Sequence, residues 1–286
     1  YYKVLVRLTP KSLDKTGRKA SVYGSIAALL LVAPIIIGIR GGTSESTTNI
    51  GQVYYSSNQF LNHSAVNPVF SFMSSFERTA GDNCEYKLLD EKVCASIMKG
   101  LYNTESTDVD TLLNTRRPNV LIVIMEGCGG EFTELGNHPE AMPNLNRMAN
   151  EGVYFTNCYG NSYRTDRGTV SILSGYPSFP TISVMKIPSK SRTLPSIARC
   201  LTKEGYATDF LYGGDIDFTN MRSYLLSTGY QHIFSKENYT AAEQKTSKWG
   251  VRDEITFETL YNNIIHRKNT PWLSTFLTLS SHEPWV

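Results

Sequence analysis

The chain contains 286 residues, and its 28 Lys and Arg nearly balance its 26 Asp and Glu, which gives a formal net charge of +2. No long basic tract follows the apolar segment near the amino terminus, so we expect no nucleic acid partner. The five cysteines form no pattern with histidine that is typical of a zinc site, and the sequence contains no internal repeat or low-complexity run.

Residues 1–19 and 20–39 predict a membrane anchor. The first segment carries six Lys or Arg against one Asp, and the second contains an uncharged run over residues 21–39. About eighteen apolar residues can cross a bilayer, and Pro34 would kink such a helix without preventing it. Because basic residues favour the cytoplasmic side, everything after Arg40 is expected outside the membrane. A buried core helix and a signal peptide are the alternatives.

Residues 40–115 predict an extracytoplasmic connector. The segment is polar and irregular, with one helix-like piece at residues 90–101. Most of its polar residues are expected to be solvated. Cys84 and Cys94 are close enough in sequence to pair in an oxidising exterior, and the odd number of cysteines leaves at least one thiol free.

Residues 116–286 alternate apolar strands with amphipathic helices. This alternation predicts an α/β domain with a mostly parallel sheet and helices on both faces. The predicted strands are residues 120–125, 153–157, 207–212 and 272–279. The predicted helices are residues 143–150, 169–173, 194–204, 221–227 and 253–266. Asp253, at the start of the last helix, is as consistent with an N-cap as with a site residue.

Glu126 and Thr165 are the main candidates for catalysis. Glu126 closes an apolar run that predicts a buried strand, and Thr165 precedes a helix of small residues. A strand end delivers a carboxylate as a metal ligand, while a helix start offers N–H groups and a positive dipole end to a phosphate. A threonine hydroxyl needs a bound cation to become a nucleophile. Arg164 and Arg167 flank Thr165 and could offset phosphate charge.

Each of these two residues has a simpler interpretation when it is taken alone. An acidic residue at a strand end is more often a solvated loop carboxylate, and a threonine before a helix is usually an N-cap or turn residue. Their order along the chain, in a strand, helix, strand context, favours the functional interpretation of Glu126 with Thr165.

Several motifs in the second half of the chain carry a family resemblance. They are Arg117-Pro-Asn-Val-Leu-Ile-Val-Ile-Met-Glu-Gly127, Met142-Pro-Asn-Leu-Asn146, Gly152-Val-Tyr-Phe155, the segment around Thr165, Leu211-Tyr-Gly-Gly-Asp215 and Ser280-Ser-His-Glu-Pro284. From about residue 115 onward the chain resembles the lipoteichoic acid synthase and phosphoglycerol transferase branch of the alkaline phosphatase and sulfatase superfamily. The resemblance implies the alkaline phosphatase-like α/β fold.

The resemblance also implies roles for individual residues. Glu126 looks like the metal-binding glutamate, and Thr165 looks like the threonine that attacks the phosphodiester and touches the metal. Asp215 and Asn220 fall in the segment that lines the head-group pocket in relatives, and His282 looks like the histidine that contacts the transferred group. In this family the divalent metal is usually Mn²⁺ or Mg²⁺, completed by an adjacent Asp and His, and that pair is absent from the sequence.

The two ends of the sequence predict an internal fragment. The chain starts at Tyr1 without a methionine and stops at Val286, directly after the loop that carries His282. We expect a missing carboxyl-terminal part to hold the remaining metal ligands. The fragment by itself is therefore expected to bind metal weakly and to be inactive.

The predicted function is a membrane-anchored transferase. It would move a phosphoglycerol or related phospho head group from a phosphatidylglycerol-like lipid, through a covalent Thr165 intermediate, to an envelope glycan or glycolipid acceptor. The domain would lie outside an inner or plasma membrane.

Three other functions stay open. A sulfatase oxidises a Cys or Ser in a Cys/Ser-x-Pro/Ala-x-Arg segment, and the matching positions read Thr165-Asp166-Arg167-Gly168-Thr169. This mismatch disfavours a sulfuric ester hydrolase. A phosphatase or phosphoethanolamine transferase can also use a threonine at this place. The third alternative is a non-catalytic relative that only binds lipid or glycan head groups.

Overall fold

A computed structural model describes residues 18–43, 46–81, 89–101, 111–133, 136–268 and 271–284. The chain forms two compact units, Tyr1–Thr48 and Asn49–Val286. Most of the basic segment 1–19 lies outside the described residues, and so does Cys84. The predicted orientation in the membrane and the pairing of Cys84 with Cys94 therefore stay predictions.

In the residues of the first unit that the structure describes, the chain forms the long helix α2 (Arg18–Arg40). Within it, the 19 residues Val22–Arg40 include a window with a mean hydropathy of 2.4. Length and composition therefore suit a membrane span, although a signal sequence can have the same properties. Pro34 lies inside the helix, as predicted, and does not end it. Insertion of α2 into a membrane stays a prediction.

The connector of the second unit is more helical than its composition indicates. The predicted helix near residues 90–101 is confirmed as α5 (Glu91–Leu101). Three further helical pieces were not predicted: η2 (Ile50–Val53), α3 (Gln59–Ala65) and α4 (Pro68–Gly81). Local side chains explain two of these helix starts, because the amide oxygens of Asn49 and Asn58 each accept a backbone N–H of the first turn.

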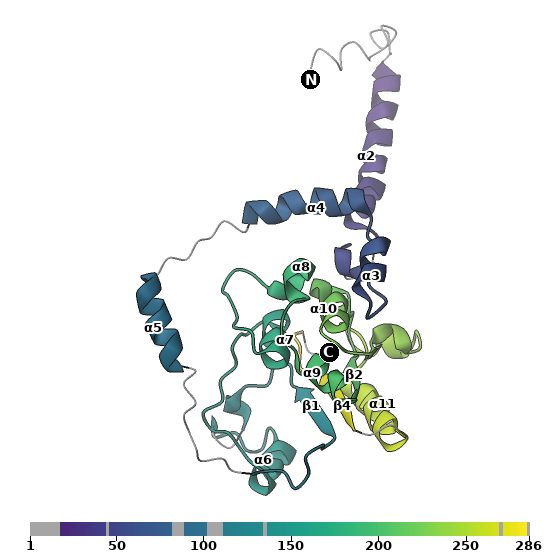
Figure 1. Ribbon diagram of the computed structural model, residues 1–286. Coiled ribbons are helices and arrows are strands. Elements are labelled where there is room, and N and C mark those ends of the chain that lie inside the picture. The colour runs from purple at the N-terminus through teal and green to yellow at the C-terminus, as the bar shows by residue number, and fades with distance from the viewer. Residues whose placement is uncertain are drawn as a thin grey trace. The chain divides into compact units, whose positions relative to one another are not determined.

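The second unit is built around a four-stranded sheet in the order β1-β4-β2-β3, and every strand pairing is parallel. The strands are β1 (Val120–Ile124), β2 (Ala207–Tyr212), β3 (His232–Phe234) and β4 (Trp272–Leu277). Figure 1 labels β1, β2 and β4. This arrangement confirms the predicted fold class. The three-residue strand β3 is too short to show an alternating or continuous apolar pattern, and it was not predicted.

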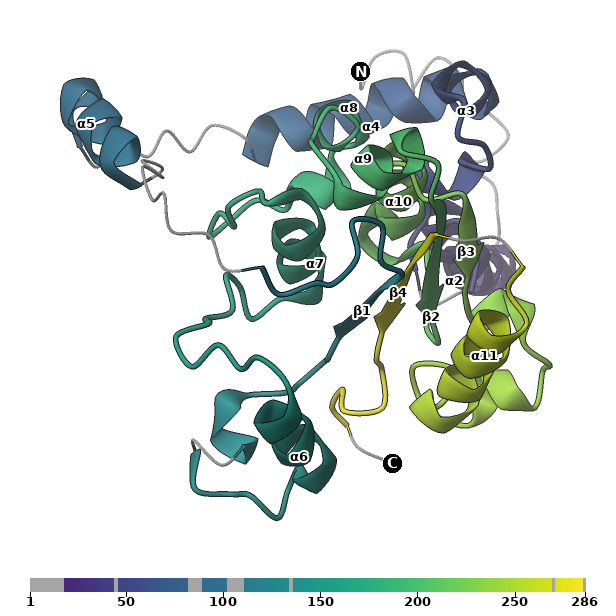
Figure 2. The same cartoon turned by 60° about the horizontal axis from the view of Figure 1, so that its bottom comes forward.

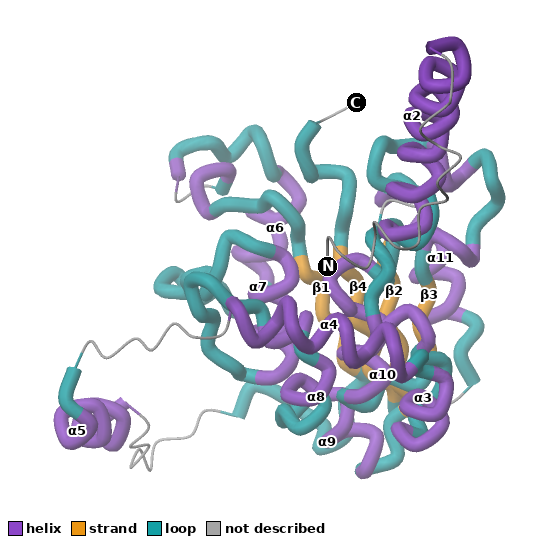
Figure 3. Tube along the Cα trace, turned by 90° about the horizontal axis from the view of Figure 1, so that it is seen from above, coloured by secondary structure: helices purple, strands orange, loops and turns teal. Residues whose placement is uncertain are grey.

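Helices cover both faces of the sheet, as predicted (Figure 2). On one face, α7 (Thr165–Ser174), α9 (Ile197–Lys203) and α10 (Met221–Ser227) pack with Phe210 and Leu277 in the main core. On the other face, Leu211 and Phe276 pack against Leu260 of α11 (Asp253–Ile265). Adjacent strand residues such as Phe210 and Leu211 thus serve opposite cores, because strand side chains alternate between faces. Figure 3 shows these helices around the strands, together with α6 (Pro143–Glu151) and α8 (Pro188–Ser191).

Two sequence predictions about strands are wrong. Residues 153–157 form turns and irregular backbone rather than a strand, and Phe155 is 69% exposed there. An apolar run becomes a strand only where a neighbouring strand supplies hydrogen bonds, and none pairs with this segment in the described structure. Strand β1 is also not fully buried. It lies at the sheet edge, and Leu121 and Val123 are 44% and 38% exposed because only the opposite face of β1 is covered.

Candidate active site

Glu126 is held at the carboxyl edge of the sheet by hydrogen bonds that extend the pairing of β1 with β4. The backbone N–H of Thr278 donates to the Ile124 carbonyl at 3.0 Å, and the Glu126 N–H donates to the Thr278 hydroxyl at 2.8 Å. Gly127 follows with φ +60, and a Cβ atom there would lie 2.8 Å from the Ser281 carbonyl oxygen. The turn after Glu126 therefore requires glycine, and it places this carboxylate beside the loop after β4.

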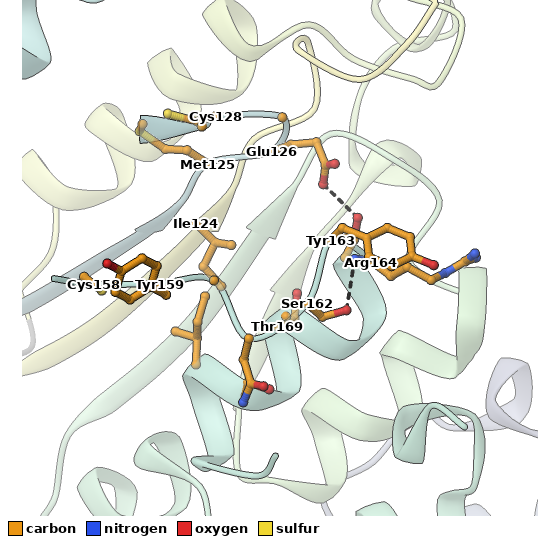
Figure 4. A pocket seen from close by; sticks show the side chains of 18 residues that line it. Ile124, Met125, Glu126, Cys128, Cys158, Tyr159, Ser162, Tyr163, Arg164 and Thr169 are labelled. Carbon is orange, nitrogen blue, oxygen red and sulfur yellow. Dashed lines mark hydrogen bonds between the residues drawn. The ribbon is translucent and has the colours of Figure 1, made fainter. Parts of the chain in front are cut away.

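Thr165 is the first residue of α7, four residues earlier than the predicted helix start. Its N-cap neighbour Arg164 has an extended backbone, and Gly175 ends the helix with φ 61. The Thr165 hydroxyl donates a hydrogen bond of 2.8 Å to Oε2 of Glu126, drawn as a dashed line in Figure 4. The structure thus brings together the carboxylate and the hydroxyl that the sequence predicted to act together.

Glu126 and Thr165 line a cavity of about 660 Å³ at this edge of the sheet. Cys128 and Cys158 also line it, and burial raises the pKa of the Cys128 thiol. A raised pKa disfavours the nucleophilic thiolate, so Cys128 is suited to packing. Its sulfur lies 3.5 Å from the sulfur of Met142.

Of the two arginines that flank Thr165 in sequence, only Arg164 lines this cavity. Its Nε lies 3.8 Å from one oxygen of the buried Asp166, whose other oxygen lies 3.9 Å from Nζ of Lys186. Two cations, Arg164 and Lys186, therefore share one buried carboxylate beside Thr165. Arg167 instead donates to the Pro180 carbonyl at 2.7 Å. A substrate-binding role for Arg167 stays a prediction that its position does not favour.

Asp215 and Asn220 follow β2 and do not line the cavity that holds Thr165. One oxygen of Asp215 accepts the Asp217 N–H at 2.9 Å. The side chain of Asn220, only 8% exposed, accepts the Gly51 N–H at 3.0 Å and donates to the Lys186 carbonyl at 3.1 Å. Asn220 thus joins the connector to the catalytic domain, while head-group binding by Asp215 and Asn220 stays a prediction.

His282 lies exposed on the loop after β4, beside the turn that follows Glu126. Its ring packs edge-on against Trp249, with ring centroids 4.8 Å apart. The Glu283 carbonyl oxygen accepts the Trp249 indole N–H at 2.9 Å and lies 2.7 Å from Nδ1 of His282. Trp249 therefore orients this imidazole, and substrate contact by His282 stays a prediction.

Asp253 secures the same loop, a role that sequence reasoning missed. Its two carboxylate oxygens accept the N–H groups of Leu279 and Ser280 at 2.8 and 2.9 Å, and its own N–H donates to the Ser280 hydroxyl at 2.8 Å. Arg252, not Asp253, is the N-cap of α11. An acidic residue in the first turn was the only sequence signal, and it does not identify a partner 26 residues away.

We expect Asp253→Asn to release the loop that carries His282. The amide can replace only one of the two accepting oxygens, which should cost about 1–3 kcal/mol of unfolding free energy. A small displacement of a site group lowers turnover by about 10- to 100-fold. Thermal unfolding and turnover of the full-length protein would measure both effects. Glu254→Gln is the matched control, because Glu254 lies in the same helical turn and its exposed carboxylate forms an ion pair with exposed Arg252. Equal losses in both variants would contradict this role.

The chemistry of the Glu126 and Thr165 pair fits part of a divalent metal site. Both side chains offer hard oxygen atoms, and the two oxygens lie 2.8 Å apart. Neighbouring ligands of an octahedral cation with bonds of about 2.1 Å lie about 3 Å from each other, so the spacing fits Mg²⁺ or Mn²⁺. Over the described ranges, no group of three or more His, Cys, Asp and Glu side chains converges. Glu126 and Thr165 would therefore supply two ligands of a larger set.

The parallel sheet, the strand-end carboxylate and the helix-start hydroxyl define a domain of the alkaline phosphatase superfamily. A solved protein of that superfamily from Vibrio parahaemolyticus is 28% identical and superposes with a TM-score of 0.60, covering 69% of this chain and 51% of that chain. The lipoteichoic acid synthase LtaP from Listeria monocytogenes, 19% identical with a TM-score of 0.51, shares the fold over 58% of this chain and 41% of its own.

The sequence profile described as Sulfatase matches residues 118–286, and the chain belongs to this family. Phosphoglycerol transferase I from Xanthomonas campestris pv. campestris is 24% identical over 181 residues, which are 59% of this chain and 26% of that protein. The enzyme of the same name from Escherichia coli is 25% identical over 180 residues, or 58% and 24% of the two chains. The matches confirm the predicted family. The chain spans about a quarter of the length of these curated relatives.

Proposed function

We propose that this chain is part of a membrane-anchored, metal-dependent transferase for phospho head groups. One observation carries this proposal. At the amino-terminal end of α7, the Thr165 hydroxyl forms a 2.8 Å hydrogen bond with the Glu126 carboxylate. The substrate would be a phosphatidylglycerol-like lipid, and the acceptor would be a hydroxyl of an envelope glycan or glycolipid. Similarity to curated phosphoglycerol transferases supports this choice of head group.

The proposed reaction has two displacement steps at phosphorus. Oγ1 of Thr165 attacks the phosphodiester of the donor, the bond from phosphorus to the diacylglycerol oxygen breaks, and diacylglycerol leaves with a proton. A hydroxyl of the acceptor then attacks the phosphothreonine, and Thr165 regains its proton. A bound divalent cation would lower the pKa of the Thr165 hydroxyl. Glu126 orients this hydroxyl, the first turn of α7 offers N–H groups to the phosphate, and Arg164 adds positive charge.

The same site could serve a phosphatase or a phosphoethanolamine transferase. A sulfatase mechanism is disfavoured, because Thr165 cannot be oxidised to the aldehyde that sulfatases form from Cys or Ser. In our proposal α2 anchors the domain at an inner or plasma membrane, with the active site outside. This placement suits a lipid donor, because it keeps the active site close to the leaflet in which that donor lies.

The head group can be tested with the full-length protein in lipid vesicles containing Mn²⁺. We expect release of diacylglycerol from phosphatidylglycerol at a rate at least tenfold higher than from phosphatidylethanolamine. An acceptor glycan should increase this release. Faster release from phosphatidylethanolamine would favour the alternative head group, and no release from either lipid would favour a binding-only relative.

A further inference from the structure

Two exposed tyrosines line the cavity that holds Thr165, and neither takes part in the displacement steps described above. Tyr159 and Tyr163 lie on the irregular segment between α6 and α7, and they are 84% and 91% exposed. Single exposed aromatic side chains are common on protein surfaces, but these two share one cavity with the proposed nucleophile. An aromatic ring gains free energy when a ligand covers it, so both rings are candidates for substrate contact.

The backbone holds Tyr163 close to Thr165. The N–H of Arg164 donates to the Ser162 hydroxyl at 3.1 Å, drawn as a dashed line in Figure 4, and this local turn encloses Tyr163. Thr165 is itself fixed by its hydrogen bond to Glu126. Because consecutive Cα atoms are 3.8 Å apart, the Cα atoms of Tyr163 and Thr165 lie within about 7.6 Å of each other. The Tyr163 ring therefore stands beside any group that is attached to the Thr165 hydroxyl.

The wall that carries these rings is both aromatic and polar. A tyrosine has an apolar face and a hydroxyl at its tip, and Asn161 and Ser162, which lie between the two tyrosines, add an amide and a hydroxyl to the same cavity. A sugar ring has matching chemistry, because C–H groups point from its faces and hydroxyls from its edge. An acyl chain matches less well, because it would cover the amide and the hydroxyls without forming hydrogen bonds to them.

We propose that Tyr159 and Tyr163 form the acceptor subsite and that Tyr163 stacks on the sugar ring of a glycan acceptor. This assignment rests on the proposed function, and it selects a sugar hydroxyl as the group that resolves the intermediate. The sugar oxygen forms a bond to phosphorus, the bond from phosphorus to Oγ1 of Thr165 breaks, and the proton of the sugar hydroxyl passes to Oγ1. An open-chain polyol has no flat C–H face, so Tyr163 favours a sugar over such a polyol.

Competition between two acceptors tests this subsite in the full-length protein, with phosphatidylglycerol vesicles and Mn²⁺. Methyl β-glucoside is the acceptor with a sugar ring, and glycerol is the acceptor without one. Tyr163→Ala should lower kcat/KM for methyl β-glucoside relative to glycerol by about five- to tenfold, because the ring contact is lost. Tyr163→Phe and Tyr163→Trp keep an aromatic ring and should retain most of the preference for the glucoside.

Binding of methyl β-glucoside can also be measured without turnover. Saturation-transfer NMR with the full-length Thr165→Ala variant should detect the glucoside, and added Tyr163→Ala should remove this signal. Tyr261→Ala is the matched control in both experiments, because Tyr261 is 64% exposed on α11 and does not line the cavity. Thermal unfolding of each variant checks that it is folded.

The two experiments separate this inference from the proposed function. A protein that binds the glucoside through Tyr163 but releases no diacylglycerol from phosphatidylglycerol would keep the glycan subsite and reject the proposed donor. The inference is overturned if the glucoside neither binds nor accepts the head group, or if Tyr163→Ala and Tyr261→Ala behave alike. Equal losses for both acceptors in Tyr163→Ala would also overturn it and would assign Tyr163 to the lipid donor. Should Tyr163→Ala fail to fold, Tyr159→Ala against Tyr261→Ala gives the same decision.

Discussion

Replacing Thr165 with alanine is expected to abolish head-group transfer while the fold persists. Thr165→Ala removes the attacking oxygen and one hydrogen bond to Glu126, so turnover should fall by roughly four orders of magnitude or more. The lost hydrogen bond should cost only about 1 kcal/mol of unfolding free energy. Diacylglycerol release by the full-length variant, together with its thermal unfolding, measures the two effects.

Two comparison variants test whether the loss of turnover comes from the missing Thr165 hydroxyl. Thr165→Ser keeps a hydroxyl at the start of α7 and should retain part of the activity. Thr259→Ala removes a hydroxyl from α11, where it donates to the Ile255 carbonyl of the same helix and also hydrogen-bonds the Tyr239 phenol, and it should leave turnover unchanged. Unchanged release of diacylglycerol by Thr165→Ala would remove the covalent intermediate from the mechanism.

Replacing Glu126 with glutamine should weaken metal binding and turnover together. Glu126→Gln keeps an oxygen that can accept the Thr165 hydroxyl, but it removes the negative charge that a divalent cation needs. We expect Mn²⁺ affinity to fall by roughly 100-fold or more, because a charged ligand is lost rather than a supporting contact. Turnover as a function of Mn²⁺ concentration and calorimetric Mn²⁺ binding would show both effects.

Glu140→Gln is the control for this charge change. The Glu140 carboxylate is exposed and contacts His138, which lies outside the proposed metal site, so its loss should not alter metal binding. If Glu126→Gln bound Mn²⁺ as tightly as the unchanged protein, Glu126 would not be a ligand. The hydrogen bond to Thr165 would then have a purely structural role.

The parts of the catalytic domain that were predicted correctly have strong local signals. The sequences of β1 and β2 are rich in β-branched and large apolar residues, which favour strands. Helix α10 has the predicted bounds, Met221–Ser227. The pairing of Glu126 with Thr165 also followed from the sequence, because parallel strands end at one edge of a sheet and the helix start must lie near that edge.

The missed features depend on contacts between distant segments. Residues 153–157 have strand-like composition but no strand partner in the described structure, and the Asn-capped helices of the connector have no strong apolar period. Arg164 lies one residue before Thr165 and Arg167 two residues after it, yet only Arg164 lines the cavity, because Arg167 donates to the Pro180 carbonyl. Sequence spacing along a helix does not by itself decide which of two neighbours enters a cavity.

The sequence by itself determined the family, the parallel α/β sheet and the identity of the carboxylate and hydroxyl that meet, because strand runs and helix starts are local patterns. Only the tertiary structure decided that Asp253 and Trp249 hold the loop of His282, that Asn220 joins the connector, and that Arg192 meets His63. These contacts join residues 26 to 169 positions apart. Such pairs form because folding brings distant segments together, and no local pattern records which partner will be near.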